Sequence, residues 1–243
     1  MKVMQEKIED NSVDFIFTDV PYGIALDKKS TDGKIDKFRK STKNTIITSD
    51  WDKFEDYADF SYKWMSIAYK KLKPKSWMAI WNHYSRIRDI HNVADKLNLR
   101  LADIFVWSKN NAPLCFPDGF TKCNEYCIVL NKTSKDKDYT RYMSKDIIRD
   151  FIVNPITSNK ERKEGFYHPT IKPRTVLYPF ITKFSKVNDL ILDPFCGSAS
   201  IPISCLETGR NFIGVEKDKT YYKNSLKRLE ISYNRVNKRL TEW

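Results

Sequence analysis

Four residues that follow a short apolar run can hold an amino group. Asp19, Val20, Pro21 and Tyr22 come directly after residues 13–17, a β-rich run typical of a buried parallel strand. The Asp19 carboxylate and the Val20 carbonyl can accept two N–H bonds, since Pro21 favours an extended conformation at the preceding residue. Tyr22 can stack on a flat ring. The set suits an exocyclic amine of a nucleobase, whose lone pair is otherwise delocalised into the ring.

A second apolar run leads into a turn that suits a nucleotide-type cofactor. Residues 190–192 are followed by Asp193, Gly197 and then Ser198, which can cap a following helix. A single glycine does not make a phosphate cradle, so a cofactor without phosphates, such as S-adenosylmethionine, fits better. Glu216 ends the next expected strand, at the spacing of a carboxylate that accepts from ribose hydroxyls.

The two turns together predict direct methyl transfer. Either segment alone could be a strand that ends in an ordinary structural turn. If they meet, a methyl group can pass in line to the amine, assisted by positioning and electrostatics, with no metal and no covalent intermediate. A target base in duplex DNA must first be flipped out of the stack.

The composition describes a basic chain with an ordinary core. The chain has 243 residues, 41% of them hydrophobic, which suits one large α/β domain or one domain with a small insertion. Its net charge of +12 favours a polyanionic partner, most commonly nucleic acid, although a lysine-rich proteome is an alternative explanation. Basic residues concentrate in the polar stretches 28–43 and 132–163.

The N-terminus and the cysteines bear on location and on metal binding. No apolar run approaches the ~20 residues of a membrane span, and residues 1–7 lack the apolar core of a secretory signal. We therefore expect a cytoplasmic protein with no membrane partner and with reduced thiols. No C-x-x-C pair or nearby histidine indicates a metal site. The cysteines, expected to be small buried residues, are Cys115, Cys123, Cys127, Cys196 and Cys205.

The spacing of apolar residues predicts alternating strands and helices. Strands are expected at residues 13–17, 77–81, 104–107, 126–130, 190–192 and 212–215, and helices at 57–72, 85–97, 176–184, 199–207 and 221–233. Met4 and Ile8 indicate another short helix. This alternation is typical of an α/β fold, with a mostly parallel twisted sheet and helices on both faces.

At these motifs the chain resembles the β group of amino-methylating DNA methyltransferases, in which the catalytic turn precedes the cofactor turn. Residues 18–23 resemble the family's D-P-P-Y motif, and residues 193–199 its D-P-F-x-G-S-G motif. Further matches are residues 168–173 to H-P-T-x-K-P, residues 211–216 to the second cofactor strand and, less specifically, residues 50–52 and 107–111.

The resemblance implies a seven-stranded, Rossmann-like sheet of an S-adenosylmethionine-dependent methyltransferase, with one antiparallel strand. It implies Asp19, Val20, Pro21 and Tyr22 as the catalytic turn. The cofactor-binding residues that it implies are His168, Thr170, Lys172, Asp193, Phe195, Gly197, Ser198 and Glu216. Aspartate at the first motif position is commonest in adenine-N6 enzymes and serine in cytosine-N4 enzymes. Asp19 therefore favours adenine N6, with cytosine N4 as the alternative.

Three departures from the family pattern are visible. Val20 replaces the first proline of the catalytic motif, and Ala199 replaces a glycine, a change that a helix start is expected to tolerate easily. Family members usually begin with a short strand whose acidic end faces the cofactor adenine, whereas Met1 stands where the following helix should start. We therefore expect one N-terminal edge strand to be missing. The alternative interpretation is that the chain is a DNA-binding relative with weakened catalytic activity.

The predicted organisation is a single methyltransferase domain, 1–243. Residues 1–130 carry the catalytic turn, about 131–167 form a small basic target-recognition insertion, and 168–243 bind the cofactor. The insertion and the loop 28–43 are expected to contact double-stranded DNA, and Trp51 either lines the pocket or packs in the core. The sequence leaves open the recognition site, a cognate restriction endonuclease and a homodimer.

Overall fold

The computed structural model describes residues 1–23, 54–112, 122–133, 149–156 and 171–241. The predictions that concern the loop 28–43, residues 50–52, Cys115, His168, Thr170 and most of the recognition insertion lie outside these residues. Among the described helices, none combines the length and the apolar character that crossing a bilayer requires. The same residues contain no cluster of side chains able to hold a metal ion.

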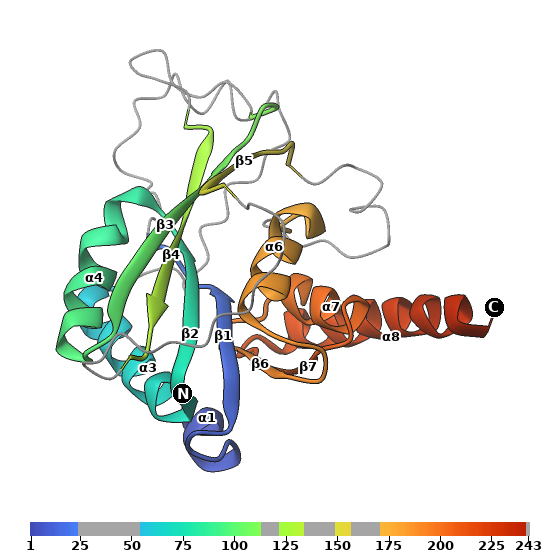
Figure 1. Cartoon of the computed structure of the whole chain (residues 1–243), viewed down its shortest axis with the longest axis horizontal. Coiled ribbons are helices and arrows are strands. Elements are labelled where there is room, and N and C mark those ends of the chain that lie inside the picture. The colour runs from blue at the N-terminus through green and yellow to red at the C-terminus, as the bar shows by residue number, and fades with distance from the viewer. Residues whose placement is uncertain (24–53, 113–121, 134–148, 157–170, 242–243) are drawn as a thin grey trace.

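Seven described strands form one sheet, as the resemblance implied (Figure 1). They are β1 (Val13–Asp19), β2 (Leu72–Asn82), β3 (Arg100–Ser108), β4 (Asn124–Asn131), β5 (Phe151–Val153), β6 (Leu190–Asp193) and β7 (Asn211–Gly214). Their spatial order is β5-β3-β4-β2-β1-β6-β7. Strand β4 runs antiparallel to both of its neighbours, and every other pairing is parallel. The predicted Rossmann-like sheet with one antiparallel strand is therefore confirmed.

Helices cover both faces of this sheet. They are α1 (Lys2–Lys7), α3 (Tyr57–Lys71), α4 (Ile87–Lys96), α6 (Arg174–Phe184), α7 (Ser200–Glu207) and α8 (Lys219–Thr241), with a 3₁₀ turn η2 (Tyr84–Arg86). Helices α3 and α4 lie on one side of the central strands and α6 on the other (Figure 1). The Asp56 side chain caps α3 by accepting from the Asp59 amide at 3.0 Å.

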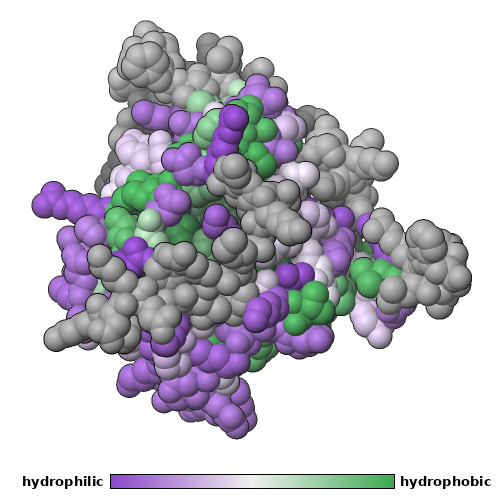
Figure 2. Space-filling view, viewed as in Figure 1, coloured by the Kyte–Doolittle hydropathy of each residue, from purple (hydrophilic) through white to green (hydrophobic). Residues whose placement is uncertain are grey.

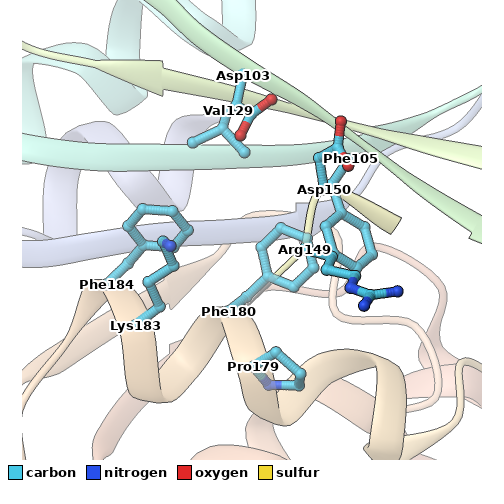
Figure 3. A pocket seen from close by; sticks show the side chains of 9 residues that line it. All are labelled: Asp103, Phe105, Val129, Arg149, Asp150, Pro179, Phe180, Lys183 and Phe184. Carbon is cyan, nitrogen blue, oxygen red and sulfur yellow. The ribbon is translucent and has the colours of Figure 1, made fainter. Parts of the chain in front are cut away.

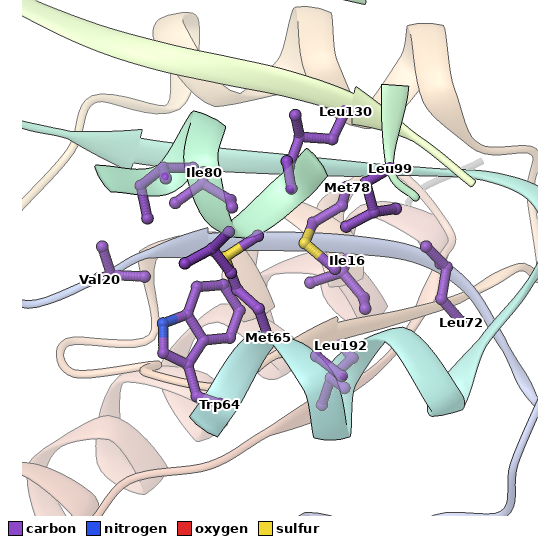
Figure 4. Packing of buried hydrophobic residues seen from close by; sticks show 14 of the residues in the cluster. Ile16, Val20, Trp64, Met65, Leu72, Met78, Ile80, Leu99, Leu130 and Leu192 are labelled. Atoms are coloured by element: carbon purple, nitrogen blue, oxygen red, sulfur yellow. The ribbon is translucent and has the colours of Figure 1, made fainter. Parts of the chain in front are cut away.

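Alternation along the strands divides the core into two layers. Ile16 of β1 packs with Trp64 and Met65 of α3, in the layer drawn in Figure 4. Its neighbours Phe15 and Phe17 point to the opposite face, where Phe17 lies 5.1 Å from the ring of Phe180 in α6. Burial on both faces explains why the consecutive residues 15–17 of β1 are all apolar rather than alternating with polar ones.

The two edges of the sheet were not fully anticipated. Strand β5, within the predicted insertion, pairs with the outer side of β3, and Phe151 and Val153 are exposed. Such a short strand with exposed apolar residues has no distinct sequence signal. At the other edge, β7 pairs only with β6 among the described residues.

The topology gathers several chain segments at one edge of the sheet. Strands β1, β2, β6 and β7 all end there because they are parallel, while the antiparallel β4 begins there. In open α/β sheets this carboxyl edge is where ligands bind. The described surface on the viewed face is largely hydrophilic with smaller hydrophobic areas, as the basic composition leads us to expect (Figure 2).

Candidate active site

The turns predicted to be catalytic and cofactor-binding lie side by side. Strands β1 and β6 are adjacent and parallel, with Ile16 opposite Leu192, so their carboxyl ends meet. The Thr18 hydroxyl donates to Asp193 Oδ1 at 2.8 Å, across 175 positions of sequence. Thr18 is fully buried, and Asp193 is 3% exposed. This bond joins the strand that ends in Asp19 to the strand that starts the glycine turn.

The Asp19 carboxylate sits in a network of charged and polar groups. Its Oδ2 lies 2.6 Å from Lys172 Nζ, and its Oδ1 accepts from the Tyr22 hydroxyl at 2.9 Å. Lys172 Nζ also lies 2.9 Å from Glu125 Oε2 and donates to the Tyr22 hydroxyl at 3.1 Å. Lys109 pairs with the other Glu125 oxygen. Two carboxylates and two ammonium groups thus balance each other beneath the turn.

Burial and charge set the protonation of this network. Burial raises the pKa of Asp19, and the nearby Glu125 carboxylate adds to this, while Lys172 opposes it. Burial would likewise raise the pKa of Glu125, but Lys172 and Lys109 outweigh it and lower that pKa to about 2. Burial would lower the pKa of Lys172, yet its two carboxylate partners raise it. Lys172 and Glu125 are therefore both charged at neutral pH.

The Tyr22 hydroxyl stays protonated. Burial raises its pKa well above the ordinary value, and Asp19 and Glu125 raise it further. It therefore remains a donor, with both Asp19 Oδ1 and Glu125 Oε2, the latter at 3.1 Å, within reach. A protonated tyrosine can orient a carboxylate and still present its ring to a ligand.

The backbone of the predicted catalytic turn is held by side chains from α3, the end of β2 and η2. The Tyr57 hydroxyl donates to the Pro21 carbonyl at 2.9 Å, and Asn82 donates to that hydroxyl at 2.8 Å. Arg86 donates from Nε to the Tyr22 carbonyl at 3.1 Å and from Nη2 to the Gly23 carbonyl at 2.7 Å. These bonds fix the turn although one proline of the family motif is absent.

The surroundings of residues 20 and 23 explain why valine and glycine occupy these positions. The Val20 side chain is 2% exposed and belongs to the core layer under α3. Gly23 has a φ of +62°, and a Cβ there would lie 2.8 Å from the Tyr57 ring. Any larger residue would therefore disturb the group that holds the turn.

The second turn is built around a carboxylate. Gly197, with a φ of +46°, donates its amide to Glu216 Oε2 at 2.9 Å, and the Asp218 amide donates to Oε1 at 2.7 Å. The Phe195 amide donates to Asp193 Oδ1 at 3.2 Å. Burial raises the pKa of Asp193 to about 7. A glycine turn beside a fixed carboxylate at the end of the next strand fits the ribose and amino-acid ends of S-adenosylmethionine.

Two expectations about this turn need correction. Ser198 does not cap α7, since its hydroxyl lies 2.9 Å from that of Ser200 and Ala199 occupies the N-cap without a side-chain bond. Ala199 has a φ of +60°, a conformation that favours glycine. The replacement of glycine by alanine is therefore less easily tolerated than we expected.

The predicted site residues divide into three groups. Asp19, Tyr22 and Lys172 are in direct contact, although the resemblance grouped Lys172 with the cofactor residues. The glycine-turn residues gather around Asp193 and Glu216, and Phe195 packs edge-on against Trp64 at 5.5 Å. His168 and Thr170 lie outside the described residues.

Several functional candidates escaped the sequence reasoning: Lys109, Glu125, Asn82, Tyr57 and Arg86. Glu125 was missed because its position depends on the direction of β4, whose first residues reach the carboxyl edge only in an antiparallel strand. A charged residue at the start of an apolar strand was the available signal. Asn82 directly follows the predicted strand 77–81, and Arg86 lies at the start of the predicted helix 85–97, two places where polar residues are common.

A separate recess lies between α6 and the sheet (Figure 3). It is lined by residues of β3, β4 and α6 and by the approach to β5: Asp103, Phe105, Val129, Arg149, Asp150, Pro179, Phe180, Lys183 and Phe184. It includes none of the predicted catalytic or cofactor residues. The candidate active site is therefore the carboxyl edge of the sheet.

The sheet, its single antiparallel strand and the paired turns define a Rossmann-like methyltransferase. A family model described as DNA methylase matches residues 13–227. The chain therefore belongs to the DNA methylase family. This membership confirms the predicted DNA-methylating enzyme with S-adenosylmethionine as its methyl donor.

Curated relatives match most of the chain. The type II methyltransferase M2.MboI of Moraxella bovis is 31% identical over 234 residues, covering 90% of this chain and 81% of the relative. M2.LlaDCHI of Lactococcus lactis subsp. cremoris is 30% identical, covering 92% and 84%. M2.DpnII of Streptococcus pneumoniae is also 30% identical, covering 92% and 85%.

Solved structures share the fold. The complex of M1.HpyAVI with S-adenosylmethionine has a TM-score of 0.65 at 22% identity, covering 94% of this chain and 92% of that one. The cytosine-N4-specific PvuII DNA methyltransferase has a TM-score of 0.67 at 17% identity, with coverages of 96% and 88%. At these identities the likeness concerns the fold.

Proposed function

We propose that the chain transfers a methyl group from S-adenosylmethionine to the exocyclic N6 of adenine in duplex DNA. The observation that carries this proposal is the contact between the two turns through Thr18 and Asp193. It brings the end of β1, with its oriented Asp19 carboxylate, beside the glycine turn after β6. A nitrogen held at one turn then faces a methyl donor held at the other.

Asp19, Val20 and Tyr22 act on the base. The Asp19 carboxylate and the Val20 carbonyl accept the two amino N–H bonds, which localises the nitrogen lone pair. Tyr22 stacks on the flipped ring, and the bonds of its hydroxyl to Asp19 and Lys172 hold the ring in place. The family resemblance of an aspartate at the first motif position supports adenine rather than cytosine.

The cofactor side is formed by Gly197 and Glu216. When bound, S-adenosylmethionine supplies an electrophilic methyl group on a sulfonium. Glu216, fixed by the amides of Gly197 and Asp218, accepts from ribose hydroxyls, and the glycine turn allows close approach of the backbone. His168 and Thr170 are proposed on the same side from the family motif alone.

DNA contact is proposed for the basic segments. Net charge of +12 supports binding to the phosphate backbone, with residues 131–167 and 28–43 as the recognition parts of a single domain. The division into residues 1–130, 131–167 and 168–243 stays a prediction. A cognate restriction endonuclease and a homodimer also stay predictions.

Methylome sequencing tests the proposal. DNA from cells that express the chain should carry N6-methyladenine at one sequence motif, and DNA from cells that express Asp19→Ala should not. N4-methylcytosine at a motif would support the alternative substrate. Unmodified DNA in both strains, with folded protein present, would favour the catalytically weakened relative.

A further inference from the structure

The side chain of Lys172 is buried and engages three partners at the catalytic turn. It is 5% exposed, and its ammonium lies 2.6 Å from Asp19 Oδ2, 2.9 Å from Glu125 Oε2 and 3.1 Å from the Tyr22 hydroxyl. An ammonium has three N–H bonds and no acceptor. These three contacts can therefore use its whole donor capacity.

We infer that Lys172 and Glu125 are a positioning pair for Asp19, in which Lys172 orients the carboxylate and Glu125 holds Lys172. This inference rests on the proposed function, because it concerns the carboxylate that accepts from the target amine. The four charges form the chain Asp19–Lys172–Glu125–Lys109, in which the signs alternate. Removing one member would leave a partly or fully buried charge without its partner, which is unfavourable.

The geometry leaves Asp19 able to act. Lys172 contacts its Oδ2 and Tyr22 its Oδ1, so rotation of the carboxylate is restrained from both sides. Each carboxylate oxygen has a second lone pair. An amine can therefore still be held while the carboxylate stays in place.

The position of Glu125 in the sheet allows it to hold Lys172. It lies near the start of β4, the one antiparallel strand among the seven described, which brings it to the edge where the parallel strands end. Lys109, just beyond the end of β3, neutralises it from the other side. Without Lys109, Glu125 would compete more strongly with Asp19 for Lys172.

The two members of the pair act on Asp19 with opposite sign. The positive Lys172 favours the ionised form of Asp19, and the negative Glu125 disfavours it. The other titratable groups around Asp19 are the neutral hydroxyl of Tyr22, the neutral thiol of Cys127 on β4, Asp193 on β6 and, behind Glu125, Lys109. Because the target amine needs an ionised acceptor, activity falls below the pKa of Asp19.

The pH dependence of kcat/KM on DNA tests the pair. For Lys172→Met the acidic limb should move to higher pH by about one unit or more. For Glu125→Gln, which keeps the shape and one acceptor for Lys172, it should move to lower pH. Lys63→Met is the matched control, since it removes the exposed ion pair with Asp59 and should leave the limb unchanged. A merely structural role predicts equal losses without opposite shifts.

The outcomes separate this inference from the proposed function. Limbs that move in the same direction, or not at all, overturn the inference while the methyltransferase stands. If Lys172→Met does not fold, Lys172→Arg and Glu125→Gln decide: the arginine should keep the limb near wild type and the glutamine should lower it. If the wild type is inactive on DNA, the proposed function fails. The inference can still be tested in that case by measuring the pKa of Asp19 with ¹³C NMR of labelled aspartate, in which Asp19→Asn identifies the Asp19 signal. Glu125→Gln should lower this pKa, and an unchanged or higher pKa would overturn the inference.

Discussion

Thr18 and Asp193 are joined by a buried hydrogen bond of 2.8 Å between the Thr18 hydroxyl and Asp193 Oδ1. The first residue precedes Asp19, the proposed catalytic aspartate, on β1, and the second ends β6 and starts the proposed cofactor turn. The bond therefore fixes the distance between the two halves of the active site. Replacing the hydroxyl should disturb stability and catalysis together.

Thr18→Val should lower the free energy of unfolding by about 1–2 kcal/mol. The variant removes the hydroxyl donor, whereas the acceptor, Asp193 Oδ1, stays buried without it. Valine has nearly the same shape, so the loss reports the hydrogen bond. Urea unfolding measures the effect. Thr18→Ser, which retains the hydroxyl, should lose clearly less. A loss in Thr18→Ser as large as or larger than the loss in Thr18→Val would contradict the hydrogen bond as the main contribution.

Asp193 should make the stability depend on pH. Burial raises its folded-state pKa to about 7, above the unfolded value of about 3.9. Between these values the folded protein holds a proton that the unfolded chain has released. Its stabilising contribution is therefore complete below the unfolded pKa and is lost as pH rises through the folded pKa.

The comparison with Asp193→Asn isolates this effect. The difference in free energy of unfolding, wild type minus variant, should decrease from pH 5 to pH 7 by up to about 1.4 kcal/mol per pH unit. Urea unfolding without cofactor, at several pH values, gives this difference. A difference that stays constant over the range would contradict a protonated Asp193 in the folded protein.

Two substitutions of Tyr22 should separate its orientation of the Asp19 carboxylate from its stacking on the base. Tyr22→Phe removes the donor to Asp19 Oδ1 and keeps the ring, so single-turnover methylation should slow by about tenfold, as for one lost hydrogen bond. Tyr22→Ala should also lose base stacking, worth about 1–3 kcal/mol. Fluorescence of 2-aminopurine at the target position should therefore report weaker capture of the flipped base in the alanine variant. Equal behaviour of the two variants would argue against stacking.

Glu216 should govern cofactor affinity. Its two oxygens accept from two backbone amides, whereas glutamine offers one acceptor oxygen. Glu216→Gln should raise the Kd for S-adenosylmethionine by about tenfold, equivalent to ~1.4 kcal/mol. Titration calorimetry measures this Kd. The exposed Glu230→Gln on α8 is the control and should leave it unchanged. A Kd equal to that of the control would remove Glu216 from the cofactor site.

The sequence predicted the strands that are buried on both faces and the helices that bury one broad face. The apolar runs of β1 and β6 and the helical spacing of α3 and α6 each lie within a few residues of the observed bounds. Their signal is strong because burial of a whole strand or helix face constrains many residues at once. Strand β5 carries too few buried residues to give such a signal.

The sequence also located both turns, but it could not show their partners. Lys172 was assigned to the cofactor because its motif lies beside the cofactor in the family, whereas its ammonium contacts Asp19. Glu125 was missed because a contact between residues 19 and 125 depends on strand order and direction, which local patterns do not encode. Thr18 lies in the matched motif 18–23 but received no role, because its contact with Asp193 also depends on which strands are neighbours.

The most direct test uses tritiated S-adenosylmethionine and mixed-sequence duplex DNA, followed by chromatography of the labelled nucleosides. Wild-type protein should place the label on N6-methyl-deoxyadenosine, and folded Asp19→Ala should place essentially none. If Asp19→Ala labels DNA as well as the wild type does, the role of the Asp19 turn in methyl transfer is contradicted.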